Sequence, residues 1–208
     1  MAYGFLDIAV TPSVRAAQEA EGAPDFRQGA QDRSFDRFTE AEAAFIASRD
    51  SFYMASVGET GWPYLQHRGG PPGFLRLLDD RTLAFADFRG NRQYISLGNL
   101  AANDRACLFL MDYPRRARLK IYCHVEARAL GEDPDFDARL ATPGYRGRAE
   151  RAFVLRLAAF DWNCQQHIVP RFTERELAAS LAPLGKRLEE LEAENAALRA
   201  EVARLAAG

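Results

Sequence analysis

Residues 118–129, with the sequence RLKIYCHVEARA, alternate without a break between two kinds of side chain. The odd-numbered positions are all apolar or small, whereas the even-numbered positions are all polar or amphipathic. This period of two is typical of a strand that has one face against a core and the other toward water or a ligand. The segment is the clearest strand of the sequence, and the prediction of its neighbours starts from it.

Shorter segments of β-like composition surround this strand and are separated by turn signals rich in Gly, Pro and Asp. We expect strands at 51–57, 62–68, 74–78, 82–87 and 106–111, and helices at 13–20, 40–49, 92–100 and about 147–159. Because residues 106–111 are continuously apolar, that strand is expected to be buried on both faces. Six or seven short strands with helices at both ends indicate an α+β fold built on a small antiparallel β-barrel.

The last part of the chain consists almost entirely of Ala, Leu, Glu and Arg. A capping-box pair, Thr173 and Glu176, predicts the start of a helix, which Pro183 and Gly185 are expected to kink or interrupt. Beyond them the apolar residues follow a heptad repeat. The a positions are Leu188, Asn195 and Val202, and the d positions are Leu184, Leu191, Leu198 and Leu205.

Leucine at d with a single Asn at a favours a parallel two-stranded coiled coil between two copies of the chain. The charges agree, because Arg187 would face Glu192 of the second copy and Glu194 would face Arg199. The alternative is an amphipathic helix packed on its own domain. A DNA-binding zipper is not expected, because the residues before the heptads mix acids with bases.

Composition excludes several classes of protein. The chain has 208 residues, 48% of them hydrophobic, and a net charge of −2, so wholesale disorder and a general preference for nucleic acid or membranes are not expected. We find no apolar run long enough to span a membrane and no signal peptide. The three cysteines, Cys107, Cys123 and Cys164, do not form a disulfide framework, which favours a cytoplasmic protein.

Two segments are candidates for anion binding. In residues 87–93, DFRGNRQ, a strand ends, Gly90 permits a tight turn, and a helix starts close to Arg89 and Arg92. The free N–H groups and positive dipole of a helix start, together with arginines, suit a phosphate group. In residues 113–120, YPRRARLK, three basic side chains share one face of a strand and could complete such a site.

Two further segments are candidates for contacts with a planar ligand. Residues 66–74, QHRGGPPGF, place glycines where a strand enters a loop, and glycine lets the backbone approach a flat ring closely. Residues 160–171, FDWNCQQHIVPR, concentrate aromatic, amide and imidazole groups. Cys164 and His167 have a metal-like spacing, but adjacent Cys123 and His124 point to opposite faces of a strand and cannot complete the set, so we expect no metal site.

From 38 to 130, with 161–172 as a looser block, the chain resembles the pyridoxamine 5′-phosphate oxidase-related, FMN-binding split-barrel family. It is most similar to the predicted flavin-nucleotide-binding branch, on the QHRGG and FRGNRQ segments. The resemblance implies a split barrel, FMN as cofactor, and two-fold homodimers with two FMN molecules at the interface. The domains would then be an N-terminal helix and loop at 1–37, the FMN-binding split barrel at 38–172, and the C-terminal helix at 173–208.

The resemblance also implies roles for individual residues. The strand 66–70 would contact flavin and phosphate through Arg68, the strand 85–87 would lie beside the flavin ring, and Asn91 and Arg92 would replace a phosphate-binding Arg-Lys pair. Because Asn91 is uncharged, the second charge would come from Arg89 or Lys120. The expected cofactor-binding residues are Gln66, His67, Arg68, Gly69, Gly70, Phe85, Ala86, Asp87, Arg89, Asn91, Arg92, Gln93, Arg118, Lys120, Trp162, Gln166 and His167.

Arg118 corresponds to a residue that reaches the flavin from the other subunit, and Trp162, Gln166 and His167 are expected to close over it. The substrate-binding Arg-and-His signature of the true oxidases is not recognisable, so the expected function is an FMN-dependent oxidoreductase with an unknown small-molecule substrate. His67 or His167 would be its proton donor. The alternatives are a non-catalytic flavin carrier or sensor dimerised by the coiled coil, and the same barrel with haem or a deazaflavin.

Overall fold

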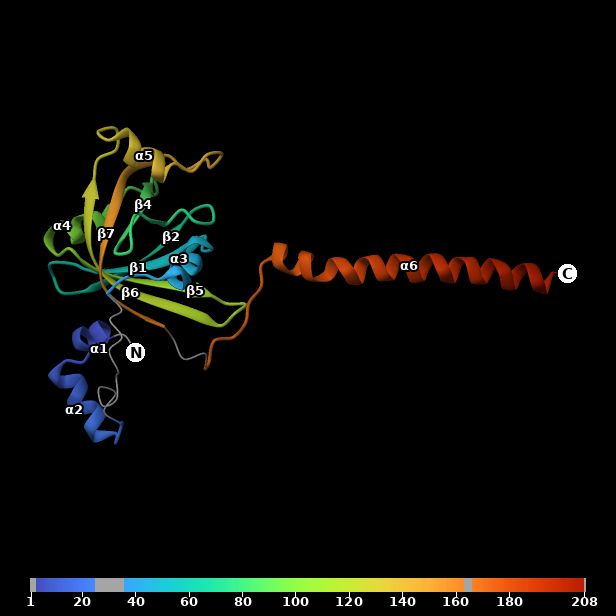
Figure 1. The fold of residues 1–208 in the computed structure, drawn as a ribbon, viewed down its shortest axis with the longest axis horizontal. Coiled ribbons are helices and arrows are strands. Elements are labelled where there is room, and N and C mark those ends of the chain that lie inside the picture. Colours follow the sequence, from blue (N-terminus) through green and yellow to red (C-terminus); the bar gives the residue numbers. More distant parts are fainter. Residues whose placement is uncertain (1–2, 25–35, 163–165, 208) are drawn as a thin grey trace. The chain divides into compact units, whose positions relative to one another are not determined.

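The computed structural model describes residues 3–24, 36–162 and 166–207, so the prediction made for Cys164 lies outside the described residues. The chain divides into two compact units, Met1–Ile168 and Val169–Gly208. The first unit contains the sheet and five helices of the described part (Figure 1). The second contains one long helix. Among the described residues, no helix is long and apolar enough to span a membrane.

The described part of the first unit forms one antiparallel sheet with the strand order β2-β1-β5-β6-β7-β4-β3. The strands are β1 (Ser51–Val57), β2 (Pro63–Gly69), β3 (Arg76–Leu77), β4 (Thr82–Phe88), β5 (Arg105–Asp112), β6 (Ala117–Arg128) and β7 (Ala149–Trp162). The helices are α1 (Tyr3–Ala9), α2 (Pro12–Ala20), α3 (Glu40–Ala47), α4 (Ile95–Ala102), α5 (Pro134–Leu140) and, in the second unit, α6 (Glu174–Ala206). The predicted α+β class with an antiparallel sheet is therefore confirmed.

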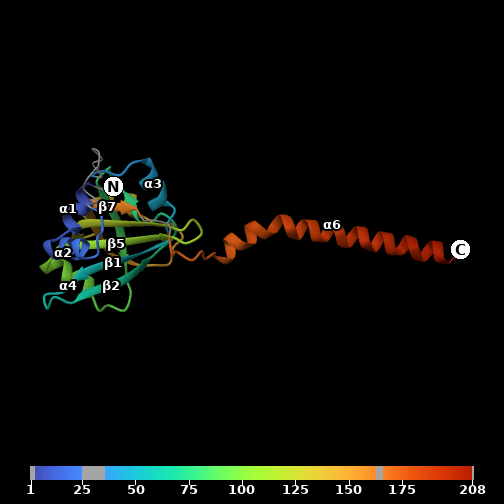
Figure 2. The ribbon, with the colours of Figure 1, turned by 90° about the horizontal axis from the view of Figure 1, so that it is seen from below.

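The alternation in residues 118–129 sets the two faces of the sheet. Leu119, Ile121, Cys123 and Val125 of β6 are buried in the main core, and the residues between them lie on the opposite face. β6 pairs with β5 on one side and with β7 on the other, and β5 in turn pairs with β1 (Figure 2). The strand predicted with the clearest pattern is thus the middle strand of the sheet.

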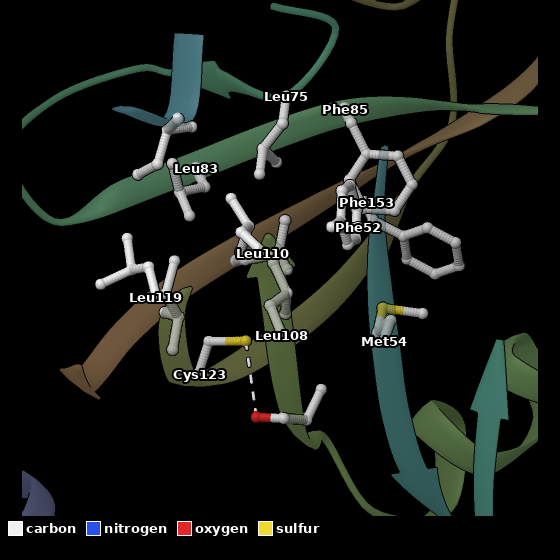
Figure 3. Close-up of a cluster of buried hydrophobic side chains, with 14 of the residues drawn as sticks. Phe52, Met54, Leu75, Leu83, Phe85, Leu108, Leu110, Leu119, Cys123 and Phe153 are labelled. Atoms are coloured by element: carbon white, nitrogen blue, oxygen red, sulfur yellow. Dashed lines mark hydrogen bonds between the residues drawn. The ribbon is translucent and has the colours of Figure 1, made fainter. Parts of the chain in front are cut away.

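The sheet is strongly curled around this core. The ring of Phe52 on β1 lies 5.2 Å from that of Phe85 on β4, edge to face, although three strands separate β1 from β4 in the sheet order. Phe153 of β7 packs against the same Phe85 ring (Figure 3). Phe74, in the loop before β3, also packs against it. The two ends of the sheet therefore lie close together, and one face of β1, β4, β5, β6 and β7 contributes to the main core.

The prediction of a helix at about 147–159 is wrong, because most of this segment belongs to β7. β7 pairs with β4 along one edge and with β6 along the other. Burial between two neighbours outweighs the helix propensity of its alanines and leucines. The helix of this region lies earlier, at α5, where Asp133 accepts a hydrogen bond from the backbone N–H of Phe136 and Pro134 occupies the first turn.

Two other expectations need correction, and one helix was not expected. The strand at 106–111 is not buried on both faces: Ala106, Leu108 and Leu110 are buried, whereas the residues between them are half-buried. The helix expected from residue 92 begins at Ile95, because the backbone before it is left-handed at Tyr94. The helix α1 was not predicted, and its Phe5 stacks on Tyr122 at 4.7 Å.

Of the two outcomes expected at Pro183 and Gly185, a kink or an interruption, the interruption is wrong, since α6 is a single helix of 33 residues that contains both. Thr173 and Glu176 form the predicted capping box, in which each side chain bonds the other's backbone N–H. A proline removes one hydrogen bond from a helix but does not have to end it when the flanking turns are rich in good helix formers. The residues on either side of Pro183 are mostly Ala and Leu.

A second capping box starts α3 and connects it to the sheet. Glu42 accepts hydrogen bonds from the backbone N–H and hydroxyl of Thr39, and its other oxygen accepts one from Trp162 Nε1 at 2.7 Å. The Trp162 ring packs edge-on against Phe45. Burial by itself raises the pKa of Glu42, but the hydrogen bonds from Thr39 and Trp162 outweigh it and hold that pKa below its ordinary value.

This arrangement predicts a pH-dependent contribution to stability. Because the pKa of Glu42 is lower in the folded than in the unfolded state, its stabilisation is complete above about pH 4.3 and is lost as the pH falls through the folded-state value. Glu42→Gln should lower the free energy of unfolding by about 1 kcal/mol at pH 7 and by less at acidic pH. Urea denaturation of Glu42→Gln and of the exposed neighbour Glu40→Gln tests this, and the same pH dependence in both variants would contradict it.

Candidate functional site

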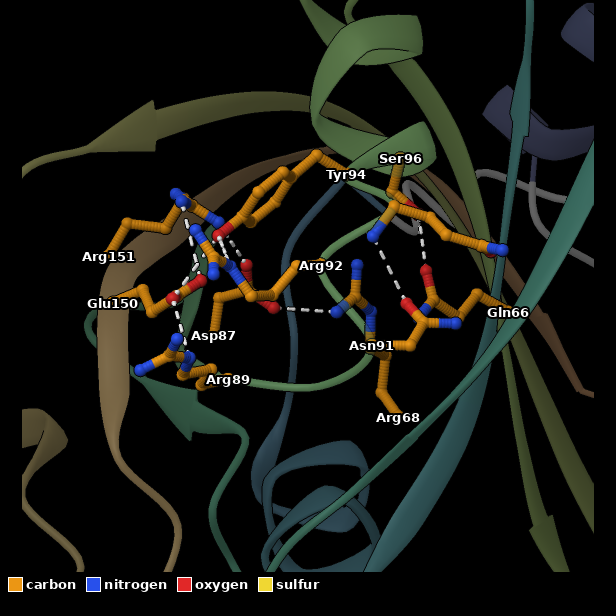
Figure 4. A network of polar contacts seen from close by, with 11 residues as sticks. Gln66, Arg68, Asp87, Arg89, Asn91, Arg92, Tyr94, Ser96, Glu150 and Arg151 are labelled. Atoms are coloured by element: carbon orange, nitrogen blue, oxygen red, sulfur yellow. Dashed lines mark hydrogen bonds and ion pairs between the residues drawn. The ribbon is translucent and has the colours of Figure 1, made fainter.

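A polar hollow of about 50 Å³ lies where the loop between β4 and α4 faces β2 (Figure 4). It sits beside the closing point of the curled sheet, because β2 is one edge strand and β4 lies next to the other edge. Its lining residues are Gln66, Arg68, Asp87, Phe88, Gly90, Asn91, Arg92, Tyr94, Ser96, Leu97 and Glu150. The hollow thus combines residues from four different elements.

A buried cluster of charges forms the floor of this hollow. Asp87 accepts a hydrogen bond from Arg68 Nη1 at 2.6 Å with one oxygen and from Arg151 Nη1 at 2.8 Å with the other. Burial lowers the pKa of Arg68, and the Asp87 carboxylate opposes that effect, so the guanidinium stays protonated. Among the described residues, the buried Nε of Arg68 has no hydrogen-bond partner. Arg68 therefore keeps one unused donor at the hollow.

Aromatic rings fix the guanidinium of Arg68 from the core side. Its central carbon lies 5.9 Å from the centre of the Phe85 ring and 5.6 Å from that of Phe153. A cation over a ring face is attracted by the ring's quadrupole, so these contacts favour the charged form. Phe85 itself is buried in the core and acts on the hollow through Arg68.

A second, more exposed set of charges forms the rim. Glu150 lies 3.7 Å from Arg89 Nε and accepts a hydrogen bond from the Tyr94 hydroxyl at 3.2 Å. The Tyr94 oxygen in turn accepts one from Arg92 Nε at 3.5 Å. Both Arg92 and Tyr94 have left-handed backbones, with φ of 62° and 52°. Such strain at non-glycine residues is frequent where a loop is shaped for binding.

The start of α4 adds backbone donors to the rim. Tyr94 is the N-cap residue of α4, and in the described chain no side chain caps the helix there. The first N–H groups of a helix lack partners within the helix and carry its positive dipole end. Ser96 donates from its hydroxyl to the Gln66 side-chain oxygen at 2.9 Å and so ties α4 to β2. Arginines around an open helix start are suited to bind an anion.

The structure brings Gln66, Arg68, Asp87, Asn91 and Arg92 together as the resemblance implied, with Arg89 beside them. The sequence analysis missed other members of the site, which are Tyr94, Ser96, Glu150 and Arg151. The last two belong to the segment expected to be a helix, and that error hid the strand β7, which pairs Arg151 with Asp87 of β4 and brings Glu150 next to it.

Other predicted site residues on β2 and β4 lie elsewhere. His67 points to the opposite face of β2 from its neighbours, with its ring 5.6 Å from that of Tyr53. A Cβ at Gly70 would lie 2.6 Å from Phe74, so this glycine makes room for a ring of the chain itself. Gly69 and Gln93 are not among the lining residues, and Ala86 is buried.

The predicted residues of the 113–120 segment and of the 161–172 block do not line the hollow either. Lys120 lies 3.2 Å from Asp161 and over the Phe5 ring, and Arg118 lies over the Phe109 ring, all on the outer face of the sheet. Trp162 is bonded to Glu42, as described above. Gln166 and His167 are exposed and follow residues 163–165, which the structure does not describe.

A larger hollow, of about 550 Å³, lies between α1 and the outer face of β1, β5 and β6. Its size suits a small ligand, but its lining is mainly apolar and contains none of the predicted site residues. Cys107 lines it, and burial raises the pKa of that thiol, which keeps it protonated and unreactive. We take the polar hollow as the site, because charge and backbone donors gather there. In the described part of the chain, no group of His, Cys, Asp or Glu could hold a metal ion.

The fold and the polar hollow define an α+β protein with a curled antiparallel sheet and an arginine-containing loop between β4 and α4. Residues 38–161 match the family model described as pyridoxamine 5′-phosphate oxidase, and the chain belongs to that family. The family predicted from the QHRGG and FRGNRQ segments is therefore confirmed. The matched range contains the polar hollow and ends before α6.

Solved structures with similar folds are distant in sequence. A protein from Clostridium acetobutylicum related to general stress protein 26 is 14% identical over 59% of this chain and 85% of its own, with a TM-score of 0.44. An FMN-binding protein from Syntrophomonas wolfei is 18% identical over 59% and 83%, with a TM-score of 0.43. An F420 reductase is 18% identical over 60% and 98%, with a TM-score of 0.44. Among curated proteins, none has significant similarity.

Proposed function

We propose that this chain is an FMN-binding flavoprotein and that the polar hollow holds the phosphate of FMN. The charge balance is the observation that supports this most directly. Among the described residues around the hollow, the arginines are Arg68, Arg89, Arg92 and Arg151, and the carboxylates are Asp87 and Glu150. The excess of two positive charges matches a phosphate monoester, which carries about −1.5 to −2 at pH 7.

The residues fit the phosphate better than any other part of the cofactor. Arg68 and Arg151 are already paired with Asp87, so the remaining donors are the terminal N–H groups of the exposed Arg92, whose Nε bonds Tyr94, and the open N–H groups of α4. The buried Nε of Arg68, in the floor of the hollow, also has no hydrogen-bond partner among the described residues. The hollow of about 50 Å³ is far smaller than the ~300 Å³ or more of a usual ligand pocket. The flavin ring would therefore lie outside it.

A second copy of the chain would supply the rest of the enclosure. We infer a homodimer with two FMN molecules at its interface, and a curled sheet that is the split barrel of the FMN-binding relatives. The outward-facing Arg118 and Lys120 do not reach the polar hollow of their own chain, which suits a role toward the second copy. When bound, FMN supplies electron transfer, while the chain binds and orients it. The proposed activity is that of an oxidoreductase acting on a small molecule.

The absorption spectrum of the purified protein tests the cofactor. Flavin absorption bands in the native protein, together with release of FMN on denaturation, would support the proposal. A haem Soret band or the spectrum of a deazaflavin would overturn it. Reduction of the bound flavin by NAD(P)H, followed by turnover with an added acceptor, would support the oxidoreductase. Chemical reduction without turnover across a broad panel of donors and acceptors would favour the second candidate.

That second candidate is a non-catalytic flavin carrier or sensor. One observation favours it: none of the sequence's three histidines, which all belong to the described part, lines the polar hollow. Two of them make other contacts, because His67 packs on Tyr53 and His124 Nδ1 lies 2.9 Å from Asp104. The usual side chain for proton transfer near pH 7 is therefore not in place within one chain.

The phosphate assignment predicts a selective loss of affinity. Arg92→Ala should raise the Kd for FMN by about tenfold to a hundredfold, because it removes a charge-assisted hydrogen bond to the phosphate. Riboflavin lacks the phosphate, so its Kd should not change. Flavin fluorescence titration measures both, with Arg15→Ala on α2 as a control of equal charge change. Equal effects of Arg92→Ala on FMN and riboflavin would show that Arg92 does not hold the phosphate.

A further inference from the structure

The proposed function leaves α6 without a role. Its described side chains are all exposed, and its apolar residues recur every three or four positions along its whole length. The stripe consists of Leu177, Leu181, Leu184, Leu188, Leu191, Asn195, Leu198, Val202 and Leu205. The sequence analysis started the heptad repeat at Leu184. Because the helix continues through Pro183, the stripe also includes Leu177 and Leu181 and begins seven residues earlier. Pro183 and Gly185 fall beside the stripe and do not interrupt it.

This stripe is the kind of surface that needs a partner. Its apolar side chains range from 44% exposed at Leu191 to 72% exposed at Leu205. A helix gains most of its stability by burying an apolar face, so a lone helix with its whole stripe in water is unfavourable. The stripe is narrow, with a period of seven residues, which is typical of a coiled-coil seam.

We propose that α6 pairs with α6 of a second copy of this chain, in parallel and in register, as a two-stranded coiled coil. Charge complementarity supports a second copy as the occupant. In that register Arg187 lies opposite Glu192 of the other copy, and Glu194 lies opposite Arg199, so both flanks of the seam pair acid with base. This inference does not rest on the flavin proposal, because α6 lies outside the matched family range.

Asn195 sets the orientation. It is the only polar residue of the stripe, at an a position. In a parallel, in-register pair it meets the same residue of the other copy, and two amides can satisfy each other's donors and acceptors. In an antiparallel pair an a position faces d positions, which are all leucine in α6. The amide would then be buried without a hydrogen-bond partner, which disfavours the antiparallel arrangement.

Spin labels on the outer side of α6 distinguish the arrangements in the full chain. Lys186 and Ala200 both lie opposite the seam and are two heptads apart, about 21 Å along a helix. We would label Lys186→Cys and Ala200→Cys one at a time, after replacing the native cysteines, and measure distances between copies by pulsed electron resonance. A parallel pair gives the same short distance at both sites. In an antiparallel pair the two labels of at least one site are offset along the helix axes by about 21 Å or more, so at least one of the two distances is longer.

A matched pair of variants tests the seam itself. Leu191→Asp with Leu198→Asp should abolish the short distance from the label at Lys186, whereas Ala193→Asp with Ala200→Asp adds the same charge on the outer side and should leave it unchanged. Asn195→Leu should keep the pairing but broaden it into more than one orientation or register. Unequal distances at the two sites, or no distance between copies at all, would overturn the inference. So would more than two coupled labels, or a short distance that survives Leu191→Asp with Leu198→Asp. Loss of flavin binding affects none of these readouts.

Discussion

Asp87→Ala is expected to lower the free energy of unfolding by about 3–5 kcal/mol. The carboxylate of Asp87 is the shared acceptor of Arg68 and Arg151, and the three side chains are only 10%, 13% and 19% exposed. Removing it leaves two guanidinium groups close together, partly desolvated, and without this counter-charge. The loss is large because an unpaired buried charge keeps its desolvation cost after its compensating interaction has gone. Urea denaturation followed by circular dichroism measures the change.

Two comparisons make this prediction specific. Asp161→Ala removes a carboxylate paired with Lys120, where both side chains are 26% exposed, and should cost about 1 kcal/mol or less. Adding Arg68→Met to Asp87→Ala should recover part of the loss, because it removes one of the two guanidinium groups that Asp87 neutralises. If Asp87→Ala costs no more than Asp161→Ala, the buried cluster does not stabilise the closing point of the sheet.

The fold was predictable where its signal is local. The alternation in residues 118–129 depends on neighbouring positions only, and it identified the middle strand together with its buried face. Residues 147–159 carry no such pattern. β7 is packed between β4 and β6, so its identity as a strand depends on partners far away in the sequence. Its burial pattern is irregular for the same reason. The residue propensities of the segment taken alone therefore predicted a helix in place of a strand.

The sequence predicted several residues of the candidate site, but it did not predict which of its arginines already have a carboxylate partner. The resemblance implied Arg68 and Arg92 alike as phosphate ligands. The structure distinguishes them: Arg68 already has a carboxylate partner, whereas Arg92 is exposed. That difference has two causes. The curl of the sheet brings Asp87 of β4 next to Arg68 of β2, and Arg151, in the segment predicted to be a helix, binds the other oxygen of Asp87. Neither contact leaves a trace in the local sequence.

The parity of a strand explains another part of the outcome. Gln66 and Arg68 line the hollow together, and His67 between them faces the other side. The resemblance gave the same binding role to every residue of the segment. In a strand, however, neighbouring side chains point to opposite faces of the sheet. The same rule places Arg118 and Lys120 on the outer face, with Leu119 between them in the core.

Phe85→Ala is expected to lower the free energy of unfolding by about 3–5 kcal/mol, because the truncation leaves a cavity in a close-packed core. Phe85 is 1% exposed, and its ring packs on Phe52 of β1 at 5.2 Å and on Phe153 of β7 at 5.5 Å. Trp62→Ala, at a position 77% exposed, is the control and should change stability by less than about 0.5 kcal/mol in the same urea titration. Since Phe85 joins the two ends of the sheet and supports the guanidinium of Arg68, the variant should also weaken FMN binding. A stable Phe85→Ala protein with unchanged FMN affinity would mean that the buried charges alone close the sheet.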